Sequence, residues 1–160
     1  MRIKVGERLP EVSLFRMGEA GPEAIASGKF FAHRRVLLFA LPGAFTPICS
    51  AAHLPGFIAA TGALREKGID EIACLAMNDV YVMDAWGKAH QSLGAVTMLA
   101  DGSGDFTRAL GLVADLSDRG FGERSQRYAL IADDGVVTHL NVEAPGKFEI
   151  SDAATMLGLL

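Results

Sequence analysis

The sequence predicts one α/β domain in which a mixed central β-sheet carries helices on both faces. Short, continuous apolar segments alternate with segments of helical periodicity, which is typical of parallel strands joined by helices. An Asp-Asp-Gly turn late in the chain joins two more apolar segments as a hairpin, which adds antiparallel strands. The length of 160 residues fits one domain over residues 1–160, and half of the residues are apolar, enough for a core.

The first expected strand–helix unit begins at residues 36–41 (VLLFAL). This apolar run is closed by Pro-Gly, which is typical of a strand buried on both faces. From Thr46 onward apolar residues recur at three- and four-residue spacing as far as Gly68, a helix stop. Pro55 lies inside this helix, and we expect it to bend the helix because proline has no N–H to donate.

A second strand over residues 72–77 follows and ends at Asn78-Asp79, where the aspartate can cap the next helix. In that helix we expect an inward-facing stripe of three side chains, namely Val82, Trp86 and Ala89.

The second half of the chain completes the sheet. A third strand is expected over residues 96–100, followed by a short helix over residues 105–110. Residues 127–132 and 136–142 then form the two strands of the hairpin. A final helix opens at Ser151 and runs to the last residue.

Composition and charge exclude several classes of protein. The net charge is −4, and no lysine or arginine tract provides the positive footprint that nucleic-acid binding needs. The longest apolar run, residues 36–41, is too short to span a bilayer. The first ten residues, MRIKVGERLP, carry charges where a signal peptide needs an apolar stretch. We therefore expect a soluble, cytoplasmic protein with no nucleic-acid or membrane partner.

The two cysteines, Cys49 and Cys74, are too few for a disulfide framework, and no CxxC or Cys/His spacing predicts a metal site. Cys49 follows the helix-opening Thr46-Pro47, so it falls in the first helical turn. Unpaired backbone N–H groups and the helix dipole favour a thiolate there. Position alone leaves two interpretations open, a reactive thiolate and a small buried hydrophobe.

Three blocks of sequence carry a family resemblance. They are LPGAFTPICSAAHLPGF (residues 41–57), DEIACLAMNDVYVMDAWGKAH (residues 70–90) and GFGERSQRYALIADDGVV (residues 120–137). In order and spacing they resemble the peroxiredoxins, specifically the type II or peroxiredoxin-5-like branch, over about residues 30–145. The resemblance implies a thioredoxin-like fold and an antioxidant thiol peroxidase that reduces hydrogen peroxide and organic hydroperoxides.

The resemblance also implies roles for single residues. Cys49 matches the peroxidatic cysteine, whose thiolate attacks a peroxide oxygen and becomes a sulfenic acid. Thr46 matches the threonine whose hydroxyl bonds the thiolate and the peroxide, and Pro42 the proline that shields the thiolate from water. Arg127 matches the arginine that supports the thiolate and polarises the peroxide, and its charge persists at all relevant pH values. This chemistry requires no metal and no organic cofactor.

Cys74 has two possible roles. It lies in an apolar strand, which favours an inert buried thiol, although some type II members use a second cysteine near this position to resolve the sulfenic acid. Peroxiredoxin-5-like members of the two-cysteine kind carry the resolving cysteine near the last helix, where this chain has Ile150 and Ser151. We therefore expect one-cysteine behaviour, with recycling by glutathione and glutaredoxin, or by thioredoxin.

The resemblance further implies a homodimer that forms beside the active-site loop, where Phe45, Trp86 and Phe121 are the apolar candidates. Two other functions compete with the peroxidase. A thioredoxin-like redox relay or binding module would not turn over peroxide, and a dithiol oxidoreductase would need CxxC where Thr46 stands. His53 lies one helical turn after Cys49; it could pair with that thiol, but the helix geometry favours a solvent-facing or capping position.

Overall fold

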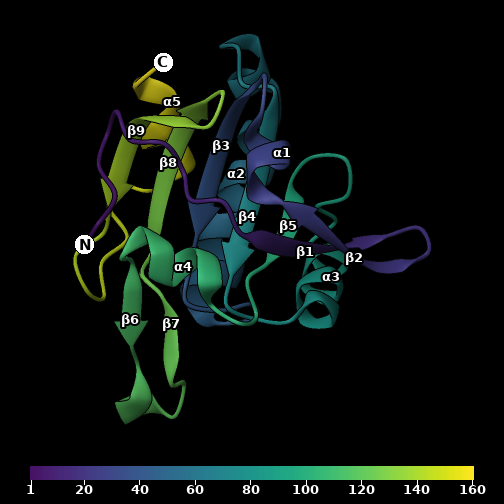
Figure 1. Cartoon of the computed structure of the whole chain (residues 1–160), viewed down its shortest axis with the longest axis vertical. Coiled ribbons are helices and arrows are strands. Elements are labelled where there is room, and N and C mark those ends of the chain that lie inside the picture. Colours follow the sequence, from purple (N-terminus) through teal and green to yellow (C-terminus); the bar gives the residue numbers. More distant parts are fainter.

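Seven strands form one mixed sheet in the computed structural model, which describes all residues from Met1 to Leu160 (Figure 1). Two further strands, β6 and β7, pair only with each other. In chain order the nine strands are β1 (Ser13–Gly18), β2 (Gly21–Ala26), β3 (Arg35–Ala40), β4 (Glu71–Ala76), β5 (Thr97–Ala100), β6 (Val113–Asp115), β7 (Glu123–Ser125), β8 (Tyr128–Asp133) and β9 (Val136–Val142). The helices are α1 (Ser27–Phe31), α2 (Leu54–Glu66), α3 (Val80–Ala89), α4 (Asp105–Leu110) and α5 (Ala153–Gly158), with a π-helical segment η1 (Cys49–His53) and a 3₁₀ turn η2 (Ser117–Arg119).

The sheet order is β2-β1-β5-β4-β3-β8-β9. The central strands β3, β4 and β5 are parallel, because helical crossovers connect them, and β8 runs antiparallel to both β3 and β9. The β8–β9 hairpin turns through Asp134 and Gly135, both with positive φ, as the Asp-Asp-Gly sequence predicts. This thioredoxin-like arrangement confirms the predicted α/β class and its mixed sheet.

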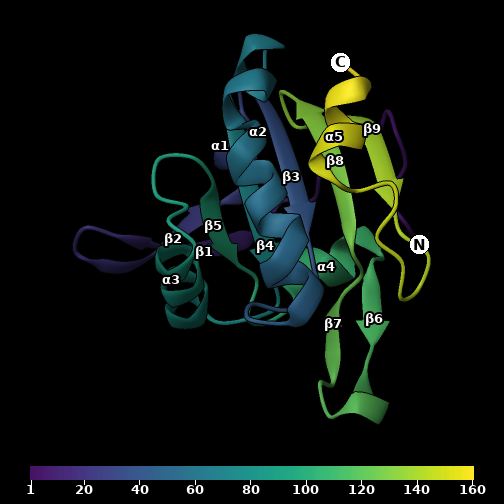
Figure 2. The ribbon, with the colours of Figure 1, turned by 180° about the vertical axis from the view of Figure 1, so that it is seen from behind.

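Helices cover both faces of the sheet, as predicted. Successive side chains of β3 point to opposite sides: Leu37 and Phe39 belong to a core shared with α2, α3 and α5. Val36 and Leu38 belong to a second core on the other face, shared with α1 and α4. Figure 1 shows α1 and α4 in front of the sheet, and Figure 2 shows α2 and α5 in front after the half turn.

Two β-ribbons were absent from the sequence prediction. The hairpin of β1 and β2 adds an antiparallel edge to the sheet, and four of the six β2 residues are exposed, so no apolar run marks that strand. The strands β6 and β7 have three residues each and pair only with each other. Their ribbon projects from the body on the side away from the C-terminus (Figures 1 and 2). Strands this short leave no periodicity to detect.

The interruption expected at Pro55 takes the form of a π turn. The helical backbone already begins at Pro47, and the turn widens over η1, where the Leu54 N–H donates to the Cys49 carbonyl five residues back. Pro55 has no N–H for the Ala51 carbonyl, four residues back, and the wider turn accommodates this missing bond. Within η1 the side chains of Cys49 and His53 both turn inward and are buried.

The inward face of α3 differs from the predicted stripe. Its buried residues are Met83, Trp86 and Gly87, whereas Val82 is half-buried and Ala89 is exposed. A Cβ on Gly87 would lie 2.7 Å from the Met98 side chain, so the missing side chain lets α3 approach β5 closely on this face. Trp86 is fully buried, and its Nε1 donates to Ser50 Oγ at 2.9 Å. The expectation that it contributes to an exposed dimer surface is wrong.

Both ends of the last helix differ from the prediction. It begins at Ala153, after the N-cap Asp152, rather than at Ser151, because the aspartate accepts from the Thr155 N–H, and it ends at Gly158 rather than at the last residue. The longest helix, α2, has 13 residues, and none of the helices combines the length and the apolar character that a membrane span requires.

The core contains a buried hydroxyl, that of Tyr128, whose removal tests the packing. The Tyr128 side chain is fully buried and its Oη has no hydrogen-bond partner; burial raises the pKa of this hydroxyl, so it stays protonated. We expect Tyr128→Phe to raise the free energy of unfolding by about 1 kcal/mol, because it removes an unsatisfied buried polar group. Urea denaturation measures the change. The control Tyr128→Leu leaves a cavity and should lose about 2 kcal/mol; a loss in Tyr128→Phe as well would contradict the expectation.

Candidate active site

The loop that follows β3 is fixed at several points. The Ala44 N–H donates to Asn78 Oδ1 at 2.9 Å, which ties the loop to the end of the neighbouring strand β4. Phe45 takes a left-handed conformation with φ 65°, so the chain reverses sharply there. Thr46 Oγ1 donates to the Gly43 carbonyl at 2.7 Å, inside the same loop. The loop thereby delivers the chain to the helix that begins at Pro47.

Cys49 lies in the first turn of that helix, as predicted from Thr46-Pro47, and is completely buried. Its Sγ accepts a hydrogen bond of 3.0 Å from the NH2 group of Arg127. A guanidinium is always charged, so this contact is a charge-assisted hydrogen bond to the sulfur atom. The site therefore holds a buried sulfur atom next to a permanent positive charge.

The sheet register explains how two residues 78 positions apart meet. Tyr128 pairs with Ala40, so Arg127, one residue before β8, lies beside the end of β3 where the active-site loop begins. On its other side the Arg127 carbonyl accepts from the Glu143 N–H at 2.9 Å, which extends the β8–β9 ladder by one step. Backbone pairing on both sides thus fixes the position from which the guanidinium reaches Cys49.

His53 is a site residue that the sequence analysis placed wrongly. It is fully buried rather than solvent-facing, and its Nδ1 lies 2.7 Å from the NH1 group of Arg127. Arginine only donates, so Nδ1 must accept and the ring proton must sit on Nε2. That Nε2–H donates to the Ser151 carbonyl at 3.0 Å. His53 therefore contacts Arg127 and not the thiol, so the alternative of a direct Cys–His pair does not hold either.

Aromatic rings enclose His53 and set its charge. The ring centroids of Phe39, Phe57 and Phe148 lie 5.0, 5.6 and 4.9 Å from that of the histidine. Burial, and second the charge of Arg127, lower the pKa of His53 to about 3. The imidazole is therefore neutral throughout the physiological pH range. Phe148 also lies against the Arg127 guanidinium, with 5.6 Å between its ring centroid and Cζ.

Glu143 anchors the segment that follows β9. Its carboxylate accepts from the backbone N–H groups of Glu149, Ile150 and Ser151 and from Ser151 Oγ, at distances between 2.7 and 3.0 Å. Burial alone would raise the pKa of Glu143, but these hydrogen bonds outweigh it and hold the pKa below its usual value. The anchored segment carries both Phe148 and the Ser151 carbonyl to His53.

The other residues expected at the site have different surroundings. Thr46 is half-buried, and its hydroxyl proton is taken by Gly43, so the expected hydrogen bond to the Cys49 thiolate is not formed. Pro42 is half-buried, and its carbonyl accepts from Arg124 at 3.2 Å. Arg124 is a further loop contact that the sequence analysis missed. Its position between Glu123 and Ser125, in a ribbon too short to predict, gave no signal.

Cys74 lies in the middle of β4 opposite Phe39, in the same core as Cys49. It is completely buried, and burial, followed by the nearby Cys49, raises the pKa of its thiol well above the ordinary value. A thiol with a raised pKa remains protonated and is a poor nucleophile. Both cysteines are free, and the surroundings of Cys74 are those of a structural residue.

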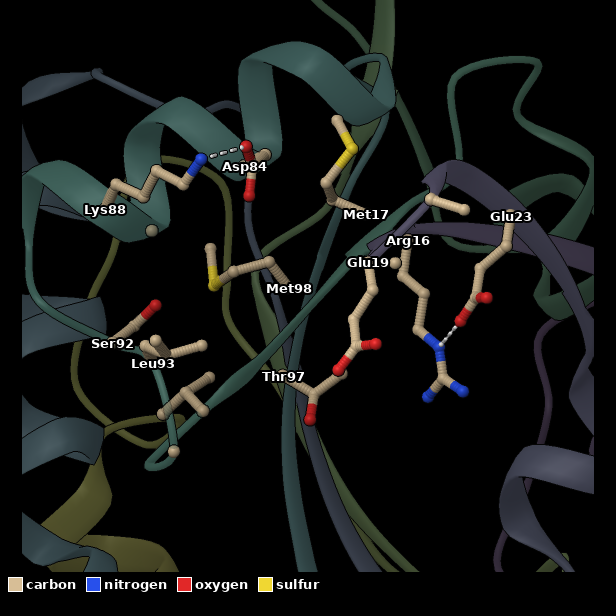
Figure 3. A pocket seen from close by; sticks show the side chains of 15 residues that line it. Arg16, Met17, Glu19, Glu23, Asp84, Lys88, Ser92, Leu93, Thr97 and Met98 are labelled. Carbon is tan, nitrogen blue, oxygen red and sulfur yellow. Dashed lines mark hydrogen bonds and ion pairs between the residues drawn. The ribbon is translucent and has the colours of Figure 1, made fainter.

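A cleft of about 690 Å³ lies elsewhere, between the β1–β2 turn, α3 and β5 (Figure 3). Four of its five charged side chains are paired, Arg16 with Glu23 at 2.8 Å and Lys88 with Asp84 at 2.9 Å, and the fifth is Glu19. Its lining includes neither the two cysteines nor Arg127. The chemistry of the molecule is therefore concentrated at the end of β3, not in this cleft.

Comparison with known proteins identifies the class to which this fold and site belong. The Redoxin family model matches residues 4–157. The chain is 46% identical to peroxiredoxin-2D of Arabidopsis thaliana, covering 99% of this chain and 98% of that protein. It is 49% identical to the chloroplastic peroxiredoxin-2E-2 of Oryza sativa subsp. japonica, covering 99% and 72%.

A solved structure agrees with these relatives. Reduced Prx3 of Vibrio vulnificus in complex with hydrogen peroxide superposes with a TM-score of 0.95, at 49% identity and 98% coverage of both chains. The chain therefore belongs to the Redoxin family. Within that family it is a peroxiredoxin, an oxidoreductase that reduces peroxides with a thiol.

The Glu143 anchor makes a prediction about acid stability. The pKa of Glu143 is lower in the folded than in the unfolded chain, so its stabilisation is complete above the unfolded pKa and is lost as pH falls through the folded pKa. We expect Glu143→Gln to be less stable than wild type by about 2 kcal/mol at pH 7, since hydrogen bonds to a charge are lost. The difference should shrink as the pH is lowered from 5 toward 3.

Urea denaturation at several pH values measures this difference. Glu149→Gln is the matched control, because the Glu149 side chain is exposed and only its backbone N–H contacts the anchor. A gap between wild type and Glu143→Gln that stays constant down to pH 3 would rule out the anchor as the source of acid sensitivity.

Proposed function

We propose that Cys49 is the peroxidatic thiol of a one-cysteine peroxiredoxin of the type II, or peroxiredoxin-5-like, branch. The observation that carries the proposal is the 3.0 Å hydrogen bond from Arg127 to Cys49 Sγ in a site closed to bulk water. The substrates are hydrogen peroxide and organic hydroperoxides. A relative of known structure binds hydrogen peroxide, which supports this substrate class.

The reaction is a two-electron transfer from sulfur. The Cys49 thiolate attacks the terminal oxygen of the peroxide, an S–O bond forms, and the O–O bond breaks. The leaving oxygen departs as hydroxide or alkoxide and takes up a proton to become water or an alcohol. Negative charge moves from sulfur to that oxygen, and Arg127, already in place, stabilises both ends of the transfer without reorganising.

Thr46 acts on the peroxide rather than on the thiolate in this proposal. Its only hydroxyl proton is donated to Gly43, so toward a substrate it offers lone pairs alone. It can therefore accept a hydrogen bond from the O–H of the peroxide and orient the oxygen that sulfur attacks. Pro42, at the start of the same loop, has in this proposal the role of limiting access of water to the thiol.

The sulfenic acid is reduced by an external thiol. A first thiol forms a mixed disulfide with Cys49 and releases water, and a second thiol then releases Cys49 and leaves with the oxidised donor. Cys74 takes no part, because its buried thiol is held in the unreactive protonated form. Glutathione with glutaredoxin is the donor that we propose, and thioredoxin is the second candidate.

Substitution of each cysteine in turn distinguishes a one-cysteine from a two-cysteine mechanism. We expect Cys49→Ser to abolish peroxide consumption with glutathione plus glutaredoxin, because the nucleophile is lost, and Cys74→Ser to retain it within about threefold. Coupled consumption of NADPH measures turnover, and the same variants assayed with thioredoxin compare the donors.

Each outcome of that assay is informative. Loss of activity in both variants would mean that Cys74 resolves the sulfenic acid. An inactive wild type with every thiol donor would overturn the peroxidase proposal in favour of a redox-relay or binding module.

We also propose that a second copy of this chain covers the apolar surface beside the active-site loop. Three large side chains of this surface are exposed: Phe45 by 57%, Ile48 by 44% and Phe121 by 39%. Exposed apolar residues gathered around one loop are typical of an interface. The positive φ of Phe45 holds its ring outward at this surface at a conformational cost, which is consistent with an interaction made there.

Light scattering coupled to size exclusion tests the dimer. We expect wild type to be a dimer at tens of micromolar and Phe45→Asn to shift it toward monomer, since asparagine tolerates the left-handed conformation but lacks the ring. Leu93→Asn, which changes an even more exposed apolar residue outside this surface, is the control and should remain dimeric. A wild type that is strictly monomeric would contradict the proposal.

A further inference from the structure

The geometry points to His53 as the positioning residue of the reaction: its neutral imidazole holds the Arg127 guanidinium in the orientation that reaches Cys49. His53 Nδ1 accepts from NH1 of Arg127 at 2.7 Å, and NH2 of the same guanidinium donates to Cys49 Sγ at 3.0 Å. The guanidinium is planar, so fixing one terminal nitrogen fixes the direction of the other. This inference rests on the proposed roles of Cys49 and Arg127.

A neutral acceptor has an advantage over a charged one here. A carboxylate in the place of His53 would form an ion pair with Arg127 and compete with the thiolate for its charge. An ammonium would repel the guanidinium. A neutral ring nitrogen orients the cation and leaves its full charge to act on Cys49 and on the leaving oxygen. Arg127 forms no ion pair with any carboxylate within 4.0 Å, so no other group takes up that charge.

The surroundings of His53 keep the ring in one orientation and one tautomer. Phe39 of β3 and Phe57 of α2 pack against the ring, and so does Phe148 from the segment after β9. The Ser151 carbonyl takes the Nε2 proton, so Nδ1 is left as the acceptor. The charged groups that face the ring are Arg127, Glu143 and Asp152, and the two carboxylates only partly offset burial and Arg127, so the ring stays uncharged.

Two substitutions of His53 each keep one hydrogen bond of the ring and remove the other. In His53→Asn the amide oxygen can replace Nδ1 as the acceptor for Arg127, while the contact with Ser151 is lost. In His53→Gln the longer side chain can replace the Nε2–H that Ser151 accepts, while the acceptor for Arg127 is lost. A purely structural role predicts similar effects of the two variants, or effects that follow thermal stability. A positioning role predicts that the glutamine variant is the slower one.

Single-turnover oxidation by hydrogen peroxide measures the difference. Trp86 is the one tryptophan of the chain and donates to Ser50, the residue after Cys49, so its fluorescence reports on the reacting site. We expect the second-order rate constant of His53→Gln to be about tenfold or more below that of His53→Asn, because a misaimed catalytic group has effects of this size. Similar rate constants, or a faster glutamine variant, would overturn the inference.

The Arg127→Met background shows whether His53 acts through the arginine. There the two His53 variants should differ by less than about twofold, since a residue that works only through Arg127 has nothing left to position. Alkylation of Cys49 by iodoacetamide gives a second rate that stays measurable when peroxide reduction is slow. A tenfold difference that persists without Arg127 would overturn the inference.

Nitrogen NMR of the wild-type histidines provides a test that does not depend on any variant folding well. We expect the His53 signals to show a neutral ring protonated at Nε2 at both pH 5 and pH 8. A protonated imidazolium or the Nδ1–H tautomer would exclude an acceptor at Nδ1 and overturn the inference. An inactive wild type with this same tautomer would instead mean that the proposed function fails while the geometry of His53 stands.

Discussion

The hydrogen bond from the Arg127 guanidinium to Cys49 Sγ is the interaction on which the rest of the site depends. A cation and a thiol must be brought together from residues 78 positions apart and kept from bulk water. The β3–β8 ladder places the arginine, and the loop after β3 places the cysteine. The loop after β3 and the start of β8 lie at the same end of the central sheet, so a shift in the β3–β8 register would separate Arg127 from Cys49.

Partly burying a guanidinium is costly unless its donors are satisfied. Here two of the N–H donors are paired with a sulfur atom and a neutral imidazole, and neither partner is a carboxylate. Glu143 pairs with Arg127 through the backbone, one step beyond the end of β9, yet its oxygens are taken up by the N–H groups of residues 149–151 and by the Ser151 hydroxyl. The negative charge of this buried acid thereby anchors a loop, and the positive charge of Arg127 remains available to the thiol.

The central sheet was predictable because its strands are buried on both faces. The expected strands over residues 36–41, 72–77 and 127–132 are apolar except for Arg127, and β3, β4 and β8 lie at these positions. The β1–β2 hairpin was not predictable in this way, since an edge strand with most residues exposed has neither a run nor a clean alternation. The stripe of α3 was also misplaced, because the close approach at Gly87 is a property of the packed pair and not of the helix.

In the site too, positions that follow from local sequence were predictable, and positions that depend on tertiary contacts were not. The position of Cys49 in a first turn follows from Thr46-Pro47, a local signal, and the structure places it there. His53 gave only an i, i+4 spacing, from which helix geometry favours a solvent-facing side chain. Two tertiary facts reverse that: the π turn before Pro55 turns the ring inward, and the anchored segment after β9 closes over it with Phe148 and the Ser151 carbonyl. A histidine in this setting stays neutral at physiological pH and acts as a rigid acceptor whose direction the fold determines.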